Sequence, residues 1–304
     1  MNVKTLTFGV EIETGMPRGA VTVGSYHRGV TVPNFPERGV WAESTPRTWT
    51  AQSDGSIVVP NRTGVEFVSP VLQGLDGLEN LAMAVARIKA MGAKVNATCG
   101  VHVHVGFPSN DLAALRRLVH LVAHWESAMF ATTGTKSREN NSYCRSIKNA
   151  SSRSANYQSR SSLSGTFGNE RYRTLNLVNL LMGRQPTVEF RIFSGSTNPD
   201  KIVAWTMLCL SLVEAALQNK RAKTFDMPQT STLRETGDGE GEKLVKAMLN
   251  DLWIWNGKSK TAAQFDHPKY THKWARKHLL RMAQTYDEVE VEVESSTDEP
   301  AQTN

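Results

Sequence analysis

The sequence predicts an α+β fold, and three kinds of pattern lead to this prediction. Residues 5–14 alternate apolar and polar side chains, which is the period of a strand with two different faces. Residues 99–107 and 187–193 repeat that alternation. Several longer segments instead carry apolar side chains at the 3.6-residue spacing of helices. The expected helices are residues 75–91, 110–132, 198–217, 241–255 and 270–284.

Shorter features complete the expected organisation of the chain. Residues 49–59 and 65–69 are further strand candidates, separated by a turn-like Pro-Asn-Arg-Thr-Gly segment. Residues 134–170 are rich in Ser, Asn and Arg, which predicts a long mobile loop, interpreted as a solvated lid. Residues 287–304 hold seven acidic and no basic side chains, which predicts a disordered tail. The expectation is therefore a single domain over residues 1–286 followed by this tail.

The composition favours an enzyme-sized globular body with an anionic partner. The 304 residues are 39% hydrophobic and carry a net charge of +6. Without the acidic tail, 35 basic side chains face 22 acidic ones, a net charge of +13, which suits phosphates, a polyanionic substrate or nucleic acid. No apolar run is long enough to span a bilayer, and no signal peptide is evident. Three cysteines without CxxC spacing fit a reducing cytoplasm, so a cytoplasmic location is expected.

The polar faces of the predicted strands carry the chemistry. Glu11 and Glu13 lie two residues apart, so both carboxylates project from one face of their strand. His102 and His104 share a face in the same way, and so do Glu189 and Arg191. Each pair taken alone fits an ordinary solvated sheet surface or ion pair equally well. Because several strands place charged or imidazole side chains on the face opposite their apolar side chains, the combination favours one polar site.

The residue types in this set favour a hard cation beside phosphate. Glu66 adds a further carboxylate within residues 65–68. Carboxylates with few imidazoles suit Mg²⁺ or Mn²⁺ better than Zn²⁺. Hard cations and arginines together are typical of phosphoryl-transfer sites, yet the sequence contains neither a P-loop nor a kinase glycine loop.

Five segments occur in the following order: FGVEIET at 8–14, GVEFVSP at 64–70, TCGVHVHVG at 98–106, RYRTLNL at 171–177 and TVEFRIFSG at 187–195. Together they resemble the amidoligase family of the carboxylate–amine ligase superfamily, which includes glutamine synthetase and the glutamate–cysteine ligases. The resemblance spans roughly residues 8–217, and its most specific parts are the GxHxH and EFRxFSG blocks.

The resemblance implies a curved antiparallel sheet like the glutamine synthetase catalytic domain, with helices on its convex face, and an ATP-dependent reaction through an acyl phosphate. It implies that Glu13 and Glu66 hold one Mg²⁺ or Mn²⁺ ion, and that Glu11, His102 and Glu189 hold a second. His104, Ser194 and Gly195 would lie at the nucleotide. Arg191, Arg171 and, as a helper, Arg173 would bind the carboxylate or the transferring phosphoryl group, and Asp54 would line the amine side.

The expected partners are therefore ATP, a small-molecule or peptide carboxylate and an amine acceptor. Glutamine synthetase has a further glutamate shortly after the position of Glu66, whereas this chain has Ser69, Pro70 and Val71, so the number of metal ions stays open. A metal-dependent hydrolase and a nucleic-acid-binding module are the alternatives. The second is less favoured because the basic loop has few aromatic side chains for stacking on bases. The substrates and the oligomeric state also stay open.

Overall fold

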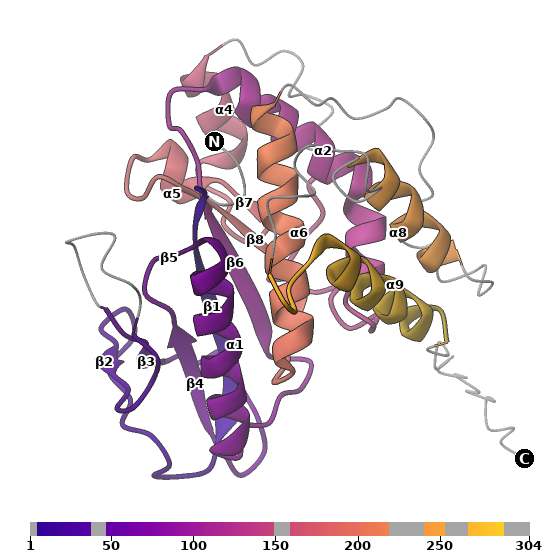
Figure 1. Cartoon of the computed structure of the whole chain (residues 1–304). Helices are drawn as coiled ribbons and strands as arrows, with labels where there is room; N and C mark the ends of the chain where they lie inside the picture. Colours follow the sequence, from indigo (N-terminus) through magenta and orange to yellow (C-terminus); the bar gives the residue numbers. More distant parts are fainter. Residues whose placement is uncertain (1–4, 38–46, 149–158, 219–239, 253–266, 289–304) are drawn as a thin grey trace, which may run out of the picture.

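A computed structural model of the chain describes residues 5–37, 47–148, 159–218, 240–252 and 267–288 (Figure 1). Its centre is an antiparallel sheet with the strand order β2-β3-β4-β1-β6-β8-β7, in which β5 pairs with one end of β1. Strand β1 lies between β4 and β6, so the residues of the first predicted strand are at the middle of the sheet. The strands are β1 (Thr7–Met16), β2 (Val30–Thr31), β3 (Thr50–Ser53), β4 (Thr63–Val68), β5 (Leu72–Gln73), β6 (Gly100–Gly106), β7 (Leu175–Asn176) and β8 (Thr187–Ser194).

One face of this sheet is apolar and fully buried. The alternation of β1 places Val10 and Ile12 on that face, and each is at most 1% exposed. Valines at alternate positions of β6 lie beside them, as do Val188 and Phe190 of β8. Burying such a row of branched side chains is the main driving force for holding the sheet against a helical layer.

The helices form the layer that covers this apolar face. Helices α1 and α6 lie over the sheet, while α8 and α9 pack further out against α2 and α6 (Figure 1). Asn198 caps α6 by accepting hydrogen bonds from two backbone N–H groups, and Pro199 occupies its first turn. The helices are α1 (Gly74–Ala90), α2 (Leu112–Ala131), α4 (Arg160–Phe167), α5 (Val178–Leu181), α6 (Pro199–Leu217), α8 (Glu240–Asp251) and α9 (His272–Glu288).

The α+β class and the antiparallel sheet with helices packed on one face are confirmed, but several element boundaries differ from expectation. The strand expected over residues 49–59 ends at Ser53, because the Asp54 side chain accepts the N–H of Ser56 at 2.7 Å and turns the chain. Helix α2 begins at Leu112 rather than at residue 110, and its cap is Asp111, which accepts the N–H of Ala114.

Part of the loop predicted over residues 134–170 is helical, and several of its described residues are buried. Cys144 and Ile147 are fully buried, and α4 occupies residues 160–167 with Leu163 and Phe167 in the core. The buried carboxylate of Glu126 on α2 accepts hydrogen bonds from the Ser146 hydroxyl and the Ile147 N–H. These polar contacts, which composition does not reveal, fasten the segment to the helical layer.

The predicted tail begins too early, because α9 continues through Asp287 and Glu288. The Asp287 carboxylate accepts the N–H groups of Gly241 and Glu242 at 2.9 Å each, at the start of α8. Residues 289–304 and the end of the helix predicted over 241–255 lie outside the described residues. None of the described helices is long and apolar enough to cross a membrane.

Candidate active site

The face of the sheet opposite the helices carries the polar site. Antiparallel pairing places Glu11 of β1 directly opposite His102 of β6, and Glu13 directly opposite Glu66 of β4. Because side chains alternate across a strand, the residues that face away from the apolar layer in three neighbouring strands meet on one surface. The strand register therefore brings together residues that are distant in sequence.

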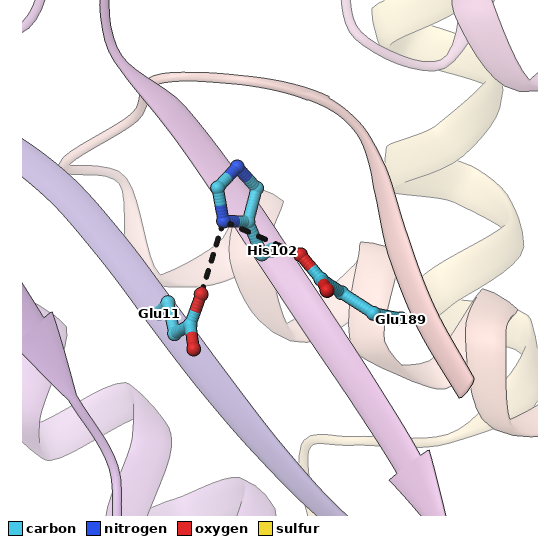
Figure 2. A group of neighbouring side chains, drawn as sticks. All are labelled: Glu11, His102 and Glu189. Atoms are coloured by element: carbon cyan, nitrogen blue, oxygen red, sulfur yellow. Dashed lines mark hydrogen bonds and ion pairs between the residues drawn. The ribbon is translucent and has the colours of Figure 1, made fainter. Parts of the chain in front are cut away.

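The first cluster consists of Glu11, His102 and Glu189 (Figure 2). Nδ1 of His102 lies 3.1 Å from Oε2 of Glu11 and 3.8 Å from Oε1 of Glu189. One ligand atom from each residue falls within 4.8 Å of the others. This is the group that the family resemblance assigns to one metal ion.

The second cluster consists of Glu13, Asp54 and Glu66, whose carboxylate oxygens also lie within 4.8 Å of one another. The N–H of Gly100 donates to Oε2 of Glu13 at 2.5 Å, which orients that carboxylate. The turn after β3 presents Asp54, so this residue lies with the two glutamates. Its position makes it a candidate third ligand beside these glutamates.

The electrostatics of the two clusters differ. Burial, together with the charges of Glu11, Glu13 and Asp54, raises the pKa of Glu66 to about 9. Burial also opposes ionisation of Glu11, but the His104 charge and hydrogen bonds from both histidines outweigh it and hold the pKa of Glu11 well below its ordinary value. Histidines offset the repulsion between carboxylates in the first cluster, whereas burial and acidic neighbours raise the pKa of Glu66 in the second.

Glu189 and Arg191 form a buried ion pair on β8. Nδ2 of Asn176 on β7 also donates to Glu189, at 2.5 Å. Burial works against both charges, yet the His104 and Arg191 charges lower the pKa of Glu189, and the Glu189 charge raises the pKa of Arg191. Both groups are therefore held in their charged forms.

These residues line one cavity of about 520 Å³. His104, with Nε2 3.2 Å from Glu11, faces the same space, and Arg171 lies at its exposed rim, where it contacts the Tyr26 hydroxyl at 3.4 Å. The predicted site residues that line the cavity are Glu11, Glu13, Asp54, Glu66, His102, His104, Arg171, Glu189 and Arg191.

Three predicted site residues are not among those lining the cavity. Arg173 turns away and donates to the carbonyl of Ser146 at 3.4 Å. Ser194 is buried at the end of β8, and Gly195 packs against Cys99, with its N–H donating to the Cys99 carbonyl at 2.9 Å. The FSG part of the motif therefore lies at the end of β8, outside the lining of this cavity.

The cavity also contains residues that the sequence reasoning did not assign. Arg138 and Tyr143 come from the segment that was predicted to be mobile, and Arg184 follows α5. Gln52 of β3 donates to Glu66 at 3.4 Å. Gln52 precedes Asp54 by two residues, so strand alternation could have indicated it. Arg138 has no comparable local signal.

The donor set fits hard divalent cations. Both clusters are rich in carboxylate oxygens, with one imidazole in the first, which is the chemistry that suits Mg²⁺ or Mn²⁺. Burial and the charges of the acidic neighbours together raise the pKa of Glu66, and a bound cation would relieve the repulsion among these carboxylates. The residues present are therefore compatible with the metal ions that the family implies.

The chain is similar in structure to "GmaS/ADP complex-Conformation 1" (10% identity, 92% of this chain and 68% of that chain, TM-score 0.44). It is also similar to "Apo GmaS without ligand" (11% identity, 92% and 70%, TM-score 0.42). No curated protein sequence matches it. Residues 4–213 match the model of the family described as "Putative amidoligase enzyme", and the chain belongs to this amidoligase family.

Proposed function

We propose that this protein is an ATP-dependent carboxylate–amine ligase that forms an amide or isopeptide bond through an acyl phosphate. The observation that carries the proposal is the combination of two acidic clusters and a buried arginine in one cavity. These groups lie in the part of the chain that matches the amidoligase family. Together they provide sites for cations and for a transferring phosphoryl group without a protein nucleophile.

The two clusters are the proposed metal-binding residues. Glu11, His102 and Glu189 would hold one Mg²⁺ or Mn²⁺ ion, and Glu13 and Glu66, joined by Asp54, would hold another. Divalent cations at such positions neutralise phosphate charge and orient phosphate oxygens. The hydrogen bonds from Gly100 to Glu13 and from Asn176 to Glu189 keep the carboxylates in place.

The reaction has two steps. An oxygen of the substrate carboxylate attacks the γ-phosphorus of ATP, the bond to the ADP oxygen breaks, and an acyl phosphate forms. Arg191, held by Glu189, offsets the negative charge of the transferring group, and Arg171 at the rim orients the carboxylate. The amine nitrogen then attacks the acyl carbon, phosphate leaves with its bonding electrons, and the nitrogen gives up one proton to solvent.

His104 is proposed to lie near the nucleotide phosphates. Burial by itself would lower its pKa, but the carboxylates of Glu11 and Glu189 raise the pKa of His104 to about 9. Its Nε2 lies 3.2 Å from Glu11, so it connects the first cluster to the open part of the cavity.

A direct test combines nucleotide and product analysis. The full chain is incubated with ATP, Mg²⁺, and panels of amino acids, short peptides and amines, and ADP release is measured with mass spectrometry of the products. A carboxylate labelled with oxygen-18 should transfer one labelled oxygen to the released phosphate. Amide hydrolysis without ATP consumption would instead support the hydrolase alternative.

A further inference from the structure

The backbone of Arg191 lies at an irregularity of the sheet. The register between β6 and β8 shifts between Val101 and Val103, so that β8 has one residue more than β6 in this interval. Such a bulge re-aims a side chain and removes ladder partners from the backbone. On the other side of β8, the N–H of Arg191 donates to the carbonyl of Thr174, the residue before β7, at 2.9 Å.

The carbonyl of Arg191 is satisfied by Arg138, whose Nη2 donates to it at 2.7 Å. Arg138 is only 2% exposed, and its guanidinium makes no ion pair with a carboxylate in the described part of the chain. Without this donor a buried carbonyl would lose its hydrogen bond, which is costly. The buried guanidinium of Arg138 therefore serves as the hydrogen-bond donor to the Arg191 carbonyl.

Gly100 leaves the space that this guanidinium needs. A Cβ at Gly100 would lie 3.2 Å from Nη2 and 3.3 Å from Nη1 of Arg138, and 3.2 Å from Nε2 of His102. These separations are tighter than ordinary van der Waals contact. Because Gly100 has no side chain, the Arg138 guanidinium can reach the bulge at Arg191.

The segment that carries Arg138 also holds the side chain of Arg191. Nε of Arg191 donates to the carbonyl of Tyr143 at 3.4 Å. Glu126 anchors this segment through Ser146 and Ile147, and it also accepts a hydrogen bond from the hydroxyl of Thr174. One buried carboxylate therefore connects both parts of the chain that contact the backbone of Arg191.

We infer that Arg138 is a positioning residue, which fixes the bulge at Arg191 and thereby the direction of the Arg191 guanidinium. The kinetic consequence rests on the proposed ligase function, whereas the structural consequence does not. Losing the hydrogen bond should misplace the guanidinium where it meets the transferring group, and misplacement of about 1 Å can cost about 100-fold in rate.

The test compares Arg138→Met, which removes the donor, with Arg138→Lys, which keeps one donor and the charge. Arg117→Met is the matched control, because Nε of Arg117 donates to the carbonyl of Ala216 at 2.7 Å and neither residue lines the cavity. The first readout is the Nε–Hε NMR signal of Arg191, assigned by its loss in Arg191→Lys. The second is kcat and KM for ATP in the ADP-release assay.

Arg138→Met should shift or broaden the Arg191 signal and lower kcat about 10- to 100-fold with little change in KM. Arg138→Lys, which keeps one donor, should recover part of the Arg191 signal and of kcat relative to Arg138→Met, and Arg117→Met should leave both readouts close to those of the parent protein. An unchanged Arg191 signal in Arg138→Met overturns the inference, and so does an equal loss of the signal and of kcat in Arg138→Lys.

If Arg138→Met does not fold, the same two measurements are made on Arg138→Gln, whose shorter side chain withdraws the donor. A parent protein without ligase activity would refute the proposed function, while the NMR signal would still decide the role of Arg138.

Discussion

Glu13 and Glu66 are directly opposed across the β1–β4 pair, with Asp54 beside them. Like charges in directly opposed positions destabilise a sheet. The protein keeps this arrangement on two central strands, where the pKa of Glu66 rises to about 9 because of burial and its acidic neighbours. This pair is where metal binding, protonation and stability should be linked.

The first prediction concerns the stability of the metal-free protein. The pKa of Glu66 is higher in the folded state, about 9, than its ordinary value of 4.5, so the folded protein binds the extra proton. The stability that this proton contributes is fully present below pH 4.5 and is lost as the pH rises through about 9. Melting temperatures in EDTA should therefore fall less steeply between pH 6 and 9 in Glu66→Gln than in the parent protein. Parallel curves would contradict the assignment.

The second prediction concerns proton release on metal binding. At pH 7 the folded, metal-free protein holds Glu66 protonated, and a cation must displace that proton to use the carboxylate. Calorimetric titration with Mn²⁺ in buffers of different ionisation enthalpy should show release of about one proton. Glu66→Gln should bind Mn²⁺ more weakly and release less. Tight binding to the parent protein without proton release would exclude Glu66 as a ligand.

The sequence predicts the faces of the central strands well, because side-chain alternation depends only on local geometry. The positions of Glu11, His102 and Glu189 on one polar surface follow from that alternation together with the family resemblance. Strand pairing is not local, so the direct opposition of Glu13 and Glu66 could be seen only in the structure.

The segment after α2 shows why other parts could not be predicted. Its Ser, Asn and Arg content resembles that of a solvated loop, yet Ile147 is buried, and its N–H and the Ser146 hydroxyl donate to the buried carboxylate of Glu126. The contribution of Arg138 depends on a bulge between β6 and β8, and no sequence pattern reveals a register shift. Composition describes what a segment contains, whereas these contacts depend on what it packs against.

The third prediction tests the anchor of that segment. Glu126 is fully buried and accepts three hydrogen bonds, so Glu126→Ala should leave buried donors unsatisfied and lower the free energy of unfolding by about 3 kcal/mol or more. Limited proteolysis should cut within residues 134–148 sooner than in the parent protein. If urea denaturation gave a loss below about 1 kcal/mol, these hydrogen bonds would not hold the segment.

The fourth prediction concerns the end of α9. Because the Asp287 carboxylate accepts two N–H groups at the start of α8, Asp287→Ala should destabilise the protein by about 1 kcal/mol.

Deletion of residues 289–304 should spare ATP turnover, since their acidic, apolar-poor sequence adds little to a packed core. Thermal melting and ADP release check the two changes separately. Loss of turnover by the deletion at unchanged solubility would show that the acidic segment takes part in function.

The last prediction compares the two ends of the buried ion pair on β8. Arg191 presents a planar fork to the transferring group, and lysine keeps the charge but not the fork. Arg191→Lys should therefore reduce turnover by about 100-fold or more, corresponding to about 3 kcal/mol of lost transition-state stabilisation, at any metal concentration. Glu189→Gln should also be impaired, but its defect should be partly recovered at high Mg²⁺ or Mn²⁺, because it weakens a ligand. Both substitutions disturb the same ion pair, so general damage to β8 would affect them alike, and the metal dependence of turnover separates the two roles. Near-normal amide formation by Arg191→Lys would refute the role of this arginine, and an equal metal response in both variants would refute the division of labour between the two residues.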